Sequence, residues 1–548
     1  MPLQKNQVLT LRVERLSSDG SGVAHSPDGE AVFIPGAAPG DEARVRIVKD
    51  CKRYAFGILD EVLIPSPDRI PVDCAVAGPC GGCSLRHLDY AAELRAKQEN
   101  VADAFARIGG LDVPVLPIVG SPEVNRYRNK VQFPVGVDKS GKPCIGFYAG
   151  RTHRIVPCPD CRLQPGVLNE IGNALCAFFA EKGIQPYSEE TGRGLVRHIF
   201  LRRGAHSGQI MVCLVCTRAR LPYAEELCTR LKAQFAEITT ILLNVNAKNT
   251  NVILGTETHT LYGPGYIEDT LCGVPVQLGP LSFYQVNTLA AEQLYGIAAQ
   301  YAQLTPDDLL LDLYCGMGTI GLSMAAHCRE LIGVEIVPEA IESAKANAAR
   351  MGTDVAAKSR FFCADAGQAA TRLAAEGLHP DIVMLDPPRK GCDEATLSAV
   401  VRMSPRRVVY VSCNPATAAR DAAWLEQNGY HAEKVQPVDL FPRTRHCEAV
   451  LLLTKLHVDR HIEVEVSMDE LDVTAAESKA TYDQIRYYVW EHYQLKVSNL
   501  YIAQVKQKHG IIERENYHKA KNENAKQPKC PKEKEDAIVE ALKHFQMI

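Results

Sequence analysis

The spacing of apolar and polar residues changes three times along the chain. Short alternating runs separated by glycine and proline turns come first and predict a small β-barrel. Strand-like and helical runs then mix, after which apolar strands alternate with helices in the rhythm of a doubly wound sheet. The predicted fold is α/β and multidomain, with an OB-like β-barrel at 1–63, a central α/β domain at 64–290, a doubly wound, Rossmann-like domain at 291–455 and a small helical extension at 456–548.

Individual elements follow from the same patterns. An amphipathic helix is expected from Tyr90 to Ile108, and a strand with interleaved basic and aromatic residues, a candidate RNA-facing surface, at Tyr127–Phe133. In the rest of the central domain, the expected elements are strands at Gly194–Arg202, Gln209–Cys216 and Thr239–Val245 and a helix at Ala224–Gln234. The expected strands of the third domain are Leu309–Leu313, Leu331–Glu335, Arg360–Cys363, Asp381–Leu385, Arg407–Val411 and Glu448–Leu453.

The overall charge does not indicate a nucleic-acid partner, because 61 basic and 65 acidic residues give a net charge of −4. Any basic footprint must be local. Lys49, Lys52, Arg53 and Tyr54 on the barrel edge fit a phosphate-backbone surface and a solvated rim equally well. The N-terminus lacks the apolar core of a signal peptide, and no run approaches the ~20 apolar residues of a membrane span. We therefore expect a cytoplasmic protein with no membrane association, and no obligate protein partner is evident.

A glycine-rich turn follows the first strand of the third domain. Gly316 to Gly321 match G-x-G-x-x-G, and Glu335 ends the next strand about 20 residues later, positioned for ribose hydroxyls. The glycine motif alone fits a nicotinamide dinucleotide or S-adenosylmethionine. Asp312 before the loop, Asp365 after the third strand and the Asp386-Pro387-Pro388-Arg389 turn after the fourth favour S-adenosylmethionine, since a dehydrogenase has no need of that turn.

Cys413 ends an apolar strand directly before a proline-started helix. Taken alone, this position fits a buried structural thiol, because free cysteine is among the most buried residue types. The strand-end rule, however, places it on one rim with Asp386 and the Glu448 segment, which favours a covalent nucleophile. A thiolate that adds to position 6 of uracil makes position 5 able to accept a methyl group, and a base must then remove the proton at position 5. Glu448 is the candidate base, whereas His446 fits a local structural or base-contacting role.

Nineteen cysteines without an export signal favour metal binding or catalysis over disulfides. Cys74, Cys80 and Cys83 form C-x5-C-x2-C in a loop rich in glycine and proline, and Cys158 and Cys161 are candidates for a fourth ligand. Four thiolates fit a [4Fe–4S] cluster or zinc. A zinc site built from two C-x2-C pairs would leave Cys74 unused, so the C-x5-C interval favours the cluster.

Together these motifs resemble the iron–sulfur-containing uracil-C5 methyltransferase family that acts on 23S ribosomal RNA. The resemblance covers residues 1 to about 455 and includes an N-terminal TRAM domain. It implies that Cys413 is the nucleophile and Glu448 the proton acceptor, and that S-adenosylmethionine contacts Gln285, Tyr314, Glu335 and Asp386. It also implies that a [4Fe–4S] cluster, structural or RNA-positioning, is held by Cys74, Cys80, Cys83 and Cys161. Cys158 is then an extra thiol without a family counterpart.

The function implied by this resemblance is formation of 5-methyluridine in 23S ribosomal RNA. The same reaction on the T-loop of transfer RNA is a close alternative, and a dinucleotide-dependent iron–sulfur oxidoreductase and a non-enzymatic iron–sulfur RNA-binding protein are more distant ones. In the extension, an acidic linker at Val464–Leu471 and helices at Thr481–Tyr493 and after Ser498 are expected, an outline similar to helix-turn-helix. Residues 503–534, with nine Lys or Arg against four Asp or Glu, suggest either extra nucleic-acid contact or a packing role.

Overall fold

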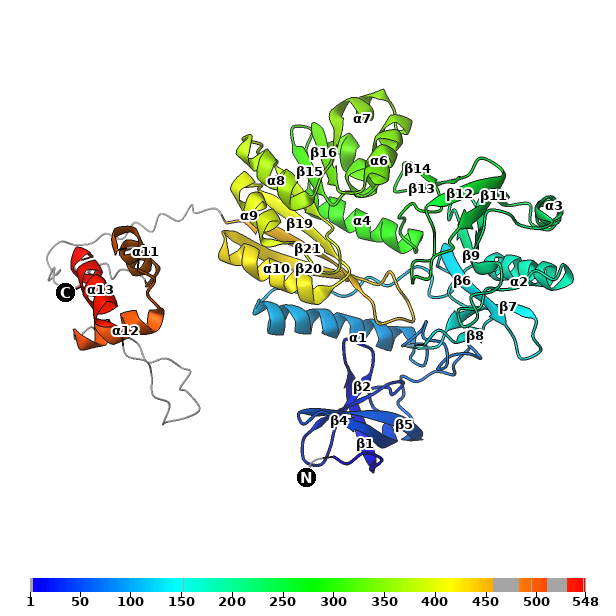
Figure 1. The fold of residues 1–548 in the computed structure, drawn as a ribbon, viewed down its shortest axis with the longest axis horizontal. Helices are drawn as coiled ribbons and strands as arrows, with labels where there is room; N and C mark the ends of the chain where they lie inside the picture. The colour runs from blue at the N-terminus through cyan, green and yellow to red at the C-terminus, as the bar shows by residue number, and fades with distance from the viewer. Residues whose placement is uncertain are drawn as a thin grey trace. The chain divides into compact units, whose positions relative to one another are not determined.

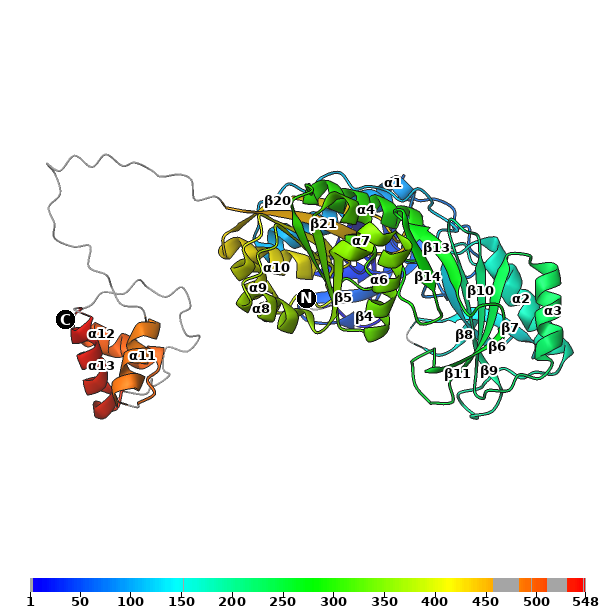
Figure 2. The same ribbon diagram turned by 90° about the horizontal axis from the view of Figure 1, so that it is seen from above.

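The computed structural model describes residues 3–150, 152–456, 482–493, 495–509, 530–545 and 547. They belong to two compact units, residues 1–457 and residues 458–548 (Figure 1; Figure 2). Among the described helices, none has the length and apolar character that a membrane-spanning segment requires.

Five N-terminal strands close into a barrel in the order β1-β2-β3-β5-β4. They are β1 (Val8–Leu16), β2 (Gly22–His25), β3 (Ala31–Ile34), β4 (Glu42–Asp50) and β5 (Tyr54–Ile64). Alternate side chains point inward, so Val13, Val32 and Val45 are fully or almost fully buried. The predicted barrel is confirmed.

A helix connects the barrel to the rest of the larger unit. It runs as α1 (Tyr90–Asp103) and continues in the wider π form as η1 (Ala104–Gly109), which ends where Gly110 adopts a left-handed conformation with φ of 64°. The expected helix is therefore confirmed, with its last turns widened. Its Val101 and Phe105 side chains belong to the same hydrophobic cluster as the sheet of the third domain, so the helix packs there.

The central domain contains a seven-stranded sheet in the order β12-β11-β10-β9-β6-β7-β8. Its strands are β6 (Lys130–Val137), β7 (Pro143–Tyr148), β8 (Ile155–Pro157), β9 (Val196–Arg203), β10 (Ile210–Cys216), β11 (Ile238–Val245) and β12 (Glu257–Tyr262). Helices α2 (Gly166–Glu181) and α3 (Ala224–Gln234) share one hydrophobic cluster with this sheet (Figure 1). A separate hairpin, β13 (Ile267–Leu271) and β14 (Val274–Leu278), leads towards the third domain.

The expected strands near residues 196, 210 and 238 and the expected helix α3 are confirmed, but the expected strand at Tyr127–Phe133 is partly wrong. β6 begins only at Lys130, and the side chains of Tyr127 and Phe133 are buried, with exposed fractions of 5% and 0%. The Tyr127 hydroxyl donates to the carbonyl of Pro442 at 2.9 Å. These aromatic rings therefore pack inside the protein and offer no stacking surface to RNA.

The third domain is built on a second seven-stranded sheet in the order β17-β16-β15-β18-β19-β21-β20. Its strands are β15 (Leu309–Leu313), β16 (Glu330–Glu335), β17 (Ser359–Cys363), β18 (Ile382–Leu385), β19 (Arg407–Ser412), β20 (Tyr430–Val438) and β21 (Glu448–Lys455). The first five in spatial order are parallel, whereas β21 runs antiparallel to both of its neighbours. All six expected strands are confirmed, and β20 is an additional one.

Helices cover both faces of this sheet. On one face, α4 (Thr288–Ala302), α5 (Thr319–Met324) and α6 (Pro338–Arg350) contribute to one hydrophobic cluster; on the other, α8 (Ala366–Ala375), α9 (Glu394–Met403) and α10 (Pro415–Gln427) contribute to a second. The remaining short helices are η2 (Ala325–His327) and α7 (Thr353–Lys358). A mostly parallel sheet covered on both faces is the predicted doubly wound architecture.

The second unit contains α11 (Tyr482–Tyr493), α12 (Asn499–Lys508) and α13 (Lys532–His544). The side chain of Ser498 caps α12, as expected, by accepting from the backbone N–H of Tyr501. The three helices enclose their own small hydrophobic cluster, which includes Ile485, Ile502 and Ile538. The expected linker at 464–471 lies outside the described residues, as does much of the basic stretch at 503–534.

Candidate active site

The carboxyl ends of the parallel strands form one rim of the third-domain sheet. Tyr314 follows β15, Glu335 ends β16, Asp386 follows β18 and Cys413 follows β19. The register of β18 with β19 pairs residue 385 with residue 410, so Asp386 and Cys413 lie close to the same level of the sheet. The fold therefore brings these four predicted site residues to a single edge.

The predicted base Glu448 joins them because β21 runs the opposite way. Ser412 pairs with Ala449 in the antiparallel ladder of β19 and β21, which places Cys413 and Glu448 at the next opposed positions. Had β21 been parallel, its first residue would lie at the far edge of the sheet. Glu448 is 6% exposed and also pairs with Val438 of β20.

Cys413 is half-buried in a turn that hydrogen bonds make rigid. Asn414 caps α10 by accepting from the backbone N–H of Ala416 at 3.2 Å, and its Nδ2 donates to the carbonyl of Arg389 at 2.9 Å. Burial raises the pKa of the Cys413 thiol, and the Glu448 and Asp386 carboxylates raise it further, whereas the Arg389 guanidinium lowers it. The sequence did not single out Arg389 as a site residue, although it is one of two cations, with Lys390, in the turn that follows β18.

Three buried carboxyl groups give the site its electrostatic character. Burial raises the pKa of Asp312 to about 8, that of Asp386 to about 7 and that of Glu448 to about 8. Oδ2 of Asp312 accepts from the backbone N–H of Gly321 at 3.0 Å, and its Oδ1 has no hydrogen-bond partner among the described residues. Mutual repulsion of Asp312 and Glu448 with Asp386 adds to the raised values. A site with this excess of buried acid favours a cationic ligand.

The glycine loop has the backbone conformation that the motif predicts. Tyr314, Gly316 and Gly318 have φ values of 66°, 55° and 78°, in the left-handed region. Glu335 accepts from the backbone N–H of Gly316 at 3.2 Å through Oε2, and from two N–H groups after β16 through Oε1. The loop and the acid are thus held together before any ligand binds. Asp365 caps α8 by accepting from the backbone N–H of Gln368 at 3.1 Å.

Gln285 approaches the rim from the segment between β14 and α4. Its backbone carbonyl accepts from Nδ2 of Asn129 at 2.8 Å. Burial raises the pKa of the Tyr295 hydroxyl; the nearby Asp386 carboxylate also raises this pKa, whereas the Gln285 side chain lowers it. Phe283, two residues earlier, is 71% exposed. The five predicted rim residues and Gln285 therefore converge from two domains.

The predicted cysteine ligands line one cavity of about 250 Å³ in the central domain. Its lining includes all five candidate cysteines and three arginines, namely Cys74, Cys80, Cys83, Cys158, Cys161, Arg86, Arg128 and Arg162. A hydrogen bond between Cys158 and Cys161 raises the pKa of Cys158 and lowers that of Cys161. Among the described residues, no three His, Cys, Asp or Glu side chains are arranged to hold a metal ion.

The donor set of this cavity fits a larger anionic group. Arg86 is 4% exposed, and its Nε and Nη2 find no hydrogen-bond partner in the described part of the chain; neither does Nε of Arg128. Buried unpaired guanidinium N–H groups are costly, and a cluster held by four thiolates would supply both negative charge and sulfur acceptors. The cavity is therefore compatible with an iron–sulfur cluster.

Comparisons with known proteins agree with this geometry. Residues 277–456 match the family model described as tRNA (uracil-5-)-methyltransferase, and residues 2–59 match the TRAM domain. An uncharacterized RNA methyltransferase of Halalkalibacterium halodurans is 43% identical over 453 residues, which are 82% of this chain and 98% of that protein. Another, of Oceanobacillus iheyensis, is 41% identical over 455 residues, which are 83% of this chain and 98% of that protein.

A solved structure is similar over most of the larger unit. The tRNA (uracil-54, C5)-methyltransferase of Pyrococcus abyssi, in complex with S-adenosyl-L-homocysteine, aligns with a TM-score of 0.65 and 26% sequence identity. The alignment covers 81% of this chain and 100% of that one.

Proposed function

Because this chain belongs to the RNA uracil-5-methyltransferase family, we propose that it forms 5-methyluridine in 23S ribosomal RNA from S-adenosylmethionine. The observation that carries the chemistry is the placement of Cys413 opposite Glu448 and beside Asp386 on one rim. The bound S-adenosylhomocysteine of the Pyrococcus abyssi relative supports the choice of methyl donor, since it is what remains after the methyl group has left. The family assignment argues against an oxidoreductase or a purely RNA-binding protein.

In this proposal Gln285, Tyr314, Glu335 and Asp386 hold the methyl donor. The sulfonium of S-adenosylmethionine supplies an activated methyl group and a positive charge. The glycine loop leaves room for close approach of the backbone, and Glu335 at the end of β16 accepts hydrogen bonds from ribose hydroxyls. The buried acids Asp312 and Asp386 then face a cation, which removes part of their cost of ionisation.

Cys413 begins the proposed reaction by adding as a thiolate to position 6 of uracil. A carbon–sulfur bond forms, and the electron pair of the 5,6 double bond moves into an enolate that extends to the oxygen at position 4. Arg389 favours the thiolate because its charge lowers the pKa of Cys413. Carbon 5 then bonds to the methyl carbon, and the methyl–sulfur bond of the donor breaks.

Glu448 completes the reaction as the proton acceptor. Its carboxylate removes the proton at position 5, the 5,6 double bond re-forms, and the bond from carbon 6 to Cys413 breaks, which releases the product and the thiolate. Since burial raises the pKa of Glu448 to about 8, its basicity near neutral pH matches that of a general base. The same burial keeps water away from the reacting carbons.

We further propose that Cys74, Cys80, Cys83 and Cys161 hold a [4Fe–4S] cluster. The cavity that these thiols share with buried guanidinium N–H groups, which have no hydrogen-bond partner among the described residues, supports this assignment. The cluster would fix the local fold or position RNA, and no step of methyl transfer involves it. The C-x5-C-x2-C motif supports 23S ribosomal RNA as the substrate, whereas the Pyrococcus abyssi relative, named for uridine 54 of transfer RNA, favours the T-loop as the second candidate.

Trapping with RNA that contains 5-fluorouracil tests the chemistry. Fluorine at position 5 cannot leave as a cation, so a covalent complex that survives denaturing gels should form with the wild-type protein and S-adenosylmethionine. The Cys413→Ala variant should form none, and full turnover by this variant on its natural substrate would refute the mechanism. Mapping 5-methyluridine in ribosomal and transfer RNA from cells that lack the protein would decide between the two substrates.

A further inference from the structure

The loop Asp439–Cys447 joins β20 to β21 and ends directly at Glu448. Val438, immediately before the loop, pairs with Glu448 across the two strands, so the loop closes on the proposed base. His446 within it makes an edge contact with the ring of Phe441, with 6.0 Å between ring centroids. Contacts that hold the start of this loop therefore act directly beside the paired strands that carry Glu448.

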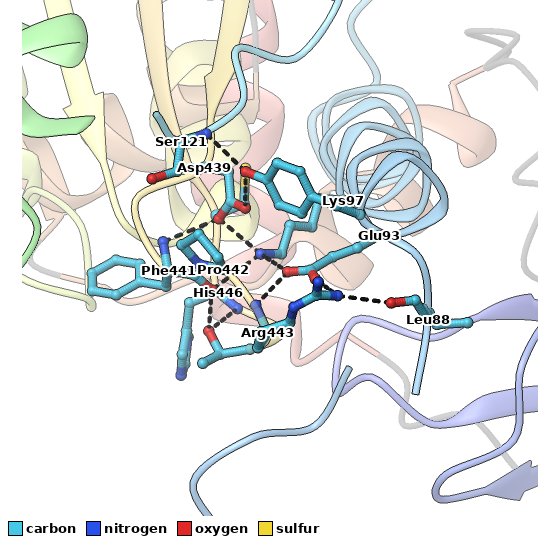
Figure 3. Close-up of polar contacts among 12 residues, drawn as sticks. Leu88, Glu93, Lys97, Ser121, Asp439, Phe441, Pro442, Arg443 and His446 are labelled. Atoms are coloured by element: carbon cyan, nitrogen blue, oxygen red, sulfur yellow. Dashed lines mark hydrogen bonds and ion pairs between the residues drawn. The ribbon is translucent and has the colours of Figure 1, made fainter. Parts of the chain in front are cut away.

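A fully buried lysine from outside the third domain holds the start of the loop (Figure 3). Lys97 lies on α1 and is 2% exposed. Its ammonium donates to Oδ1 of Asp439 at 2.8 Å, to the carbonyl of Phe441 at 3.2 Å and to Oε1 of Glu93 at 2.7 Å. An ammonium has three N–H donors, and all three are used.

The remaining contacts of this cluster reach further along the loop. Oε1 of Glu93 accepts from the backbone N–H of Arg443 at 2.7 Å, and the Arg443 guanidinium donates to the carbonyl of Leu88 at 2.7 Å (Figure 3). Oδ2 of Asp439 accepts from the hydroxyl of Tyr90 at 2.9 Å. These hydrogen bonds all join the loop to α1 or to the segment directly before α1, which lie outside the third domain.

The free energy of removing the charged groups of this cluster from water offsets much of their mutual attraction, so the cluster adds little to the stability of the fold. Glu93 and Asp439 are fully buried, and a buried ion pair often contributes no more stability than apolar residues of similar volume. What ionic hydrogen bonds provide is a defined geometry, because each donor has one acceptor position. In this cluster, the geometry that they define is that of the segment leading to Glu448.

We propose that Lys97 is a positioning residue for proton abstraction, holding the Asp439–Cys447 loop so that Glu448 faces carbon 5 of the bound uracil. The inference rests on the proposed function, since it assumes that Glu448 accepts the proton. Lys97 itself touches neither RNA nor the methyl donor in this proposal. Its loss should therefore slow the second half of the reaction more than the first.

The test measures the covalent enzyme–RNA adduct during turnover on ordinary uridine-containing RNA. In the Lys97→Met variant, thiolate addition and methyl transfer should proceed in the first turnover. Release should slow by about 10- to 100-fold, as expected for a base displaced by about 1 Å, so that methylated adduct accumulates. A purely structural role would lower adduct and turnover together, in proportion to the folded fraction.

Two further variants keep the test decisive. If Lys97→Met does not fold, the double variant Lys97→Met/Asp439→Asn removes both charges and should show the same accumulation. Asp41→Asn is the matched control, because Asp41 is also fully buried and paired with an arginine, Arg69, but lies in the barrel. It should leave the adduct fraction at the wild-type level.

An adduct fraction per folded enzyme equal to that of the wild type in both Lys97 variants would overturn the inference, as would equal accumulation in Asp41→Asn. Failure of the proposed function would look different. In that case the wild-type protein itself would form no adduct with 5-fluorouracil RNA.

Discussion

Replacing the proposed base should make the ligand-free protein more stable. In Glu448→Gln, a buried carboxyl becomes a neutral amide of nearly the same shape. Burial raises the pKa of Glu448 from its ordinary value of 4.5 to about 8. Between these two pH values the Glu448 carboxyl is ionised in the unfolded chain but protonated in the folded protein. The protonated form favours folding at low pH, and this contribution is lost as pH rises from about 4.5 through about 8.

The size of the effect follows from the difference between these two values. Because one pKa unit corresponds to 1.36 kcal/mol, the wild-type protein carries a penalty of about 1 kcal/mol at pH 5 and about 5 kcal/mol at pH 8.5 relative to a side chain that does not titrate. For the unit of residues 1–457 unfolding in one transition, with an entropy of about 2.1 cal/mol/K per residue, each kcal/mol moves the thermal midpoint by about 1 °C. We therefore expect Glu448→Gln to raise the midpoint by about 1 °C at pH 5 and by about 5 °C at pH 8.5.

Differential scanning calorimetry at several pH values measures this directly, with the larger unit followed as one transition. The matched control is Glu433→Gln, which changes an exposed glutamate of β20 and should shift the midpoint little at any pH. A gain in Glu448→Gln that is the same at pH 5 and pH 8.5 would refute the electrostatic reasoning. So would a loss of stability that grows with pH. Whatever its stability, the Glu448→Gln variant should not turn over, because it lacks the proposed proton acceptor. A catalytic group that lowers stability is a common case of the trade-off between stability and activity.

Three further predictions concern the ligands and the extension. S-adenosylmethionine should bind more tightly as pH rises from 6 to 8.5, because Asp312 and Asp386 ionise and face its sulfonium charge. S-adenosylhomocysteine, which lacks that charge, should show a weaker pH dependence, and equal slopes in titration calorimetry would contradict this. After reconstitution with iron and sulfide, Arg86→Met should retain less cluster absorbance than the exposed control Arg95→Met, and equal retention would show that Arg86 does not contact the cluster. Removal of residues 457–548 should leave the thermal midpoint of the larger unit unchanged, because the extension has its own hydrophobic cluster. If the extension contacts RNA phosphates, the same removal should weaken the salt dependence of RNA binding, and an unchanged slope would rule that contact out.

Local sequence patterns determined most of the elements of this protein. The expected bounds of β15 and α3 match the structure residue for residue, because apolar periodicity and turn residues act over a few neighbours in the chain. The backbone conformation of the glycine loop was predicted for the same reason, because the glycines of the motif themselves permit the left-handed conformation. The strand expected at Tyr127–Phe133 was partly wrong because a distant contact decides this segment. The Tyr127 side chain is buried, and its hydroxyl donates to the carbonyl of Pro442, far along the chain.

Only the tertiary structure decided which chemical groups meet. The sequence predicted that Cys413 and the Glu448 segment share one rim, but their placement at opposed positions depends on the antiparallel direction of β21, which no local pattern encodes. The convergence of five cysteines on one cavity and the bond between Lys97 and Asp439, 342 residues apart, depend in the same way on packing. Contacts between near neighbours in the chain determine whether a segment forms a helix or a strand. The pairing of distant segments is decided instead by the burial of their apolar faces in the assembled core. The charges brought together by that choice acquire the pKa values on which the proposed reaction depends.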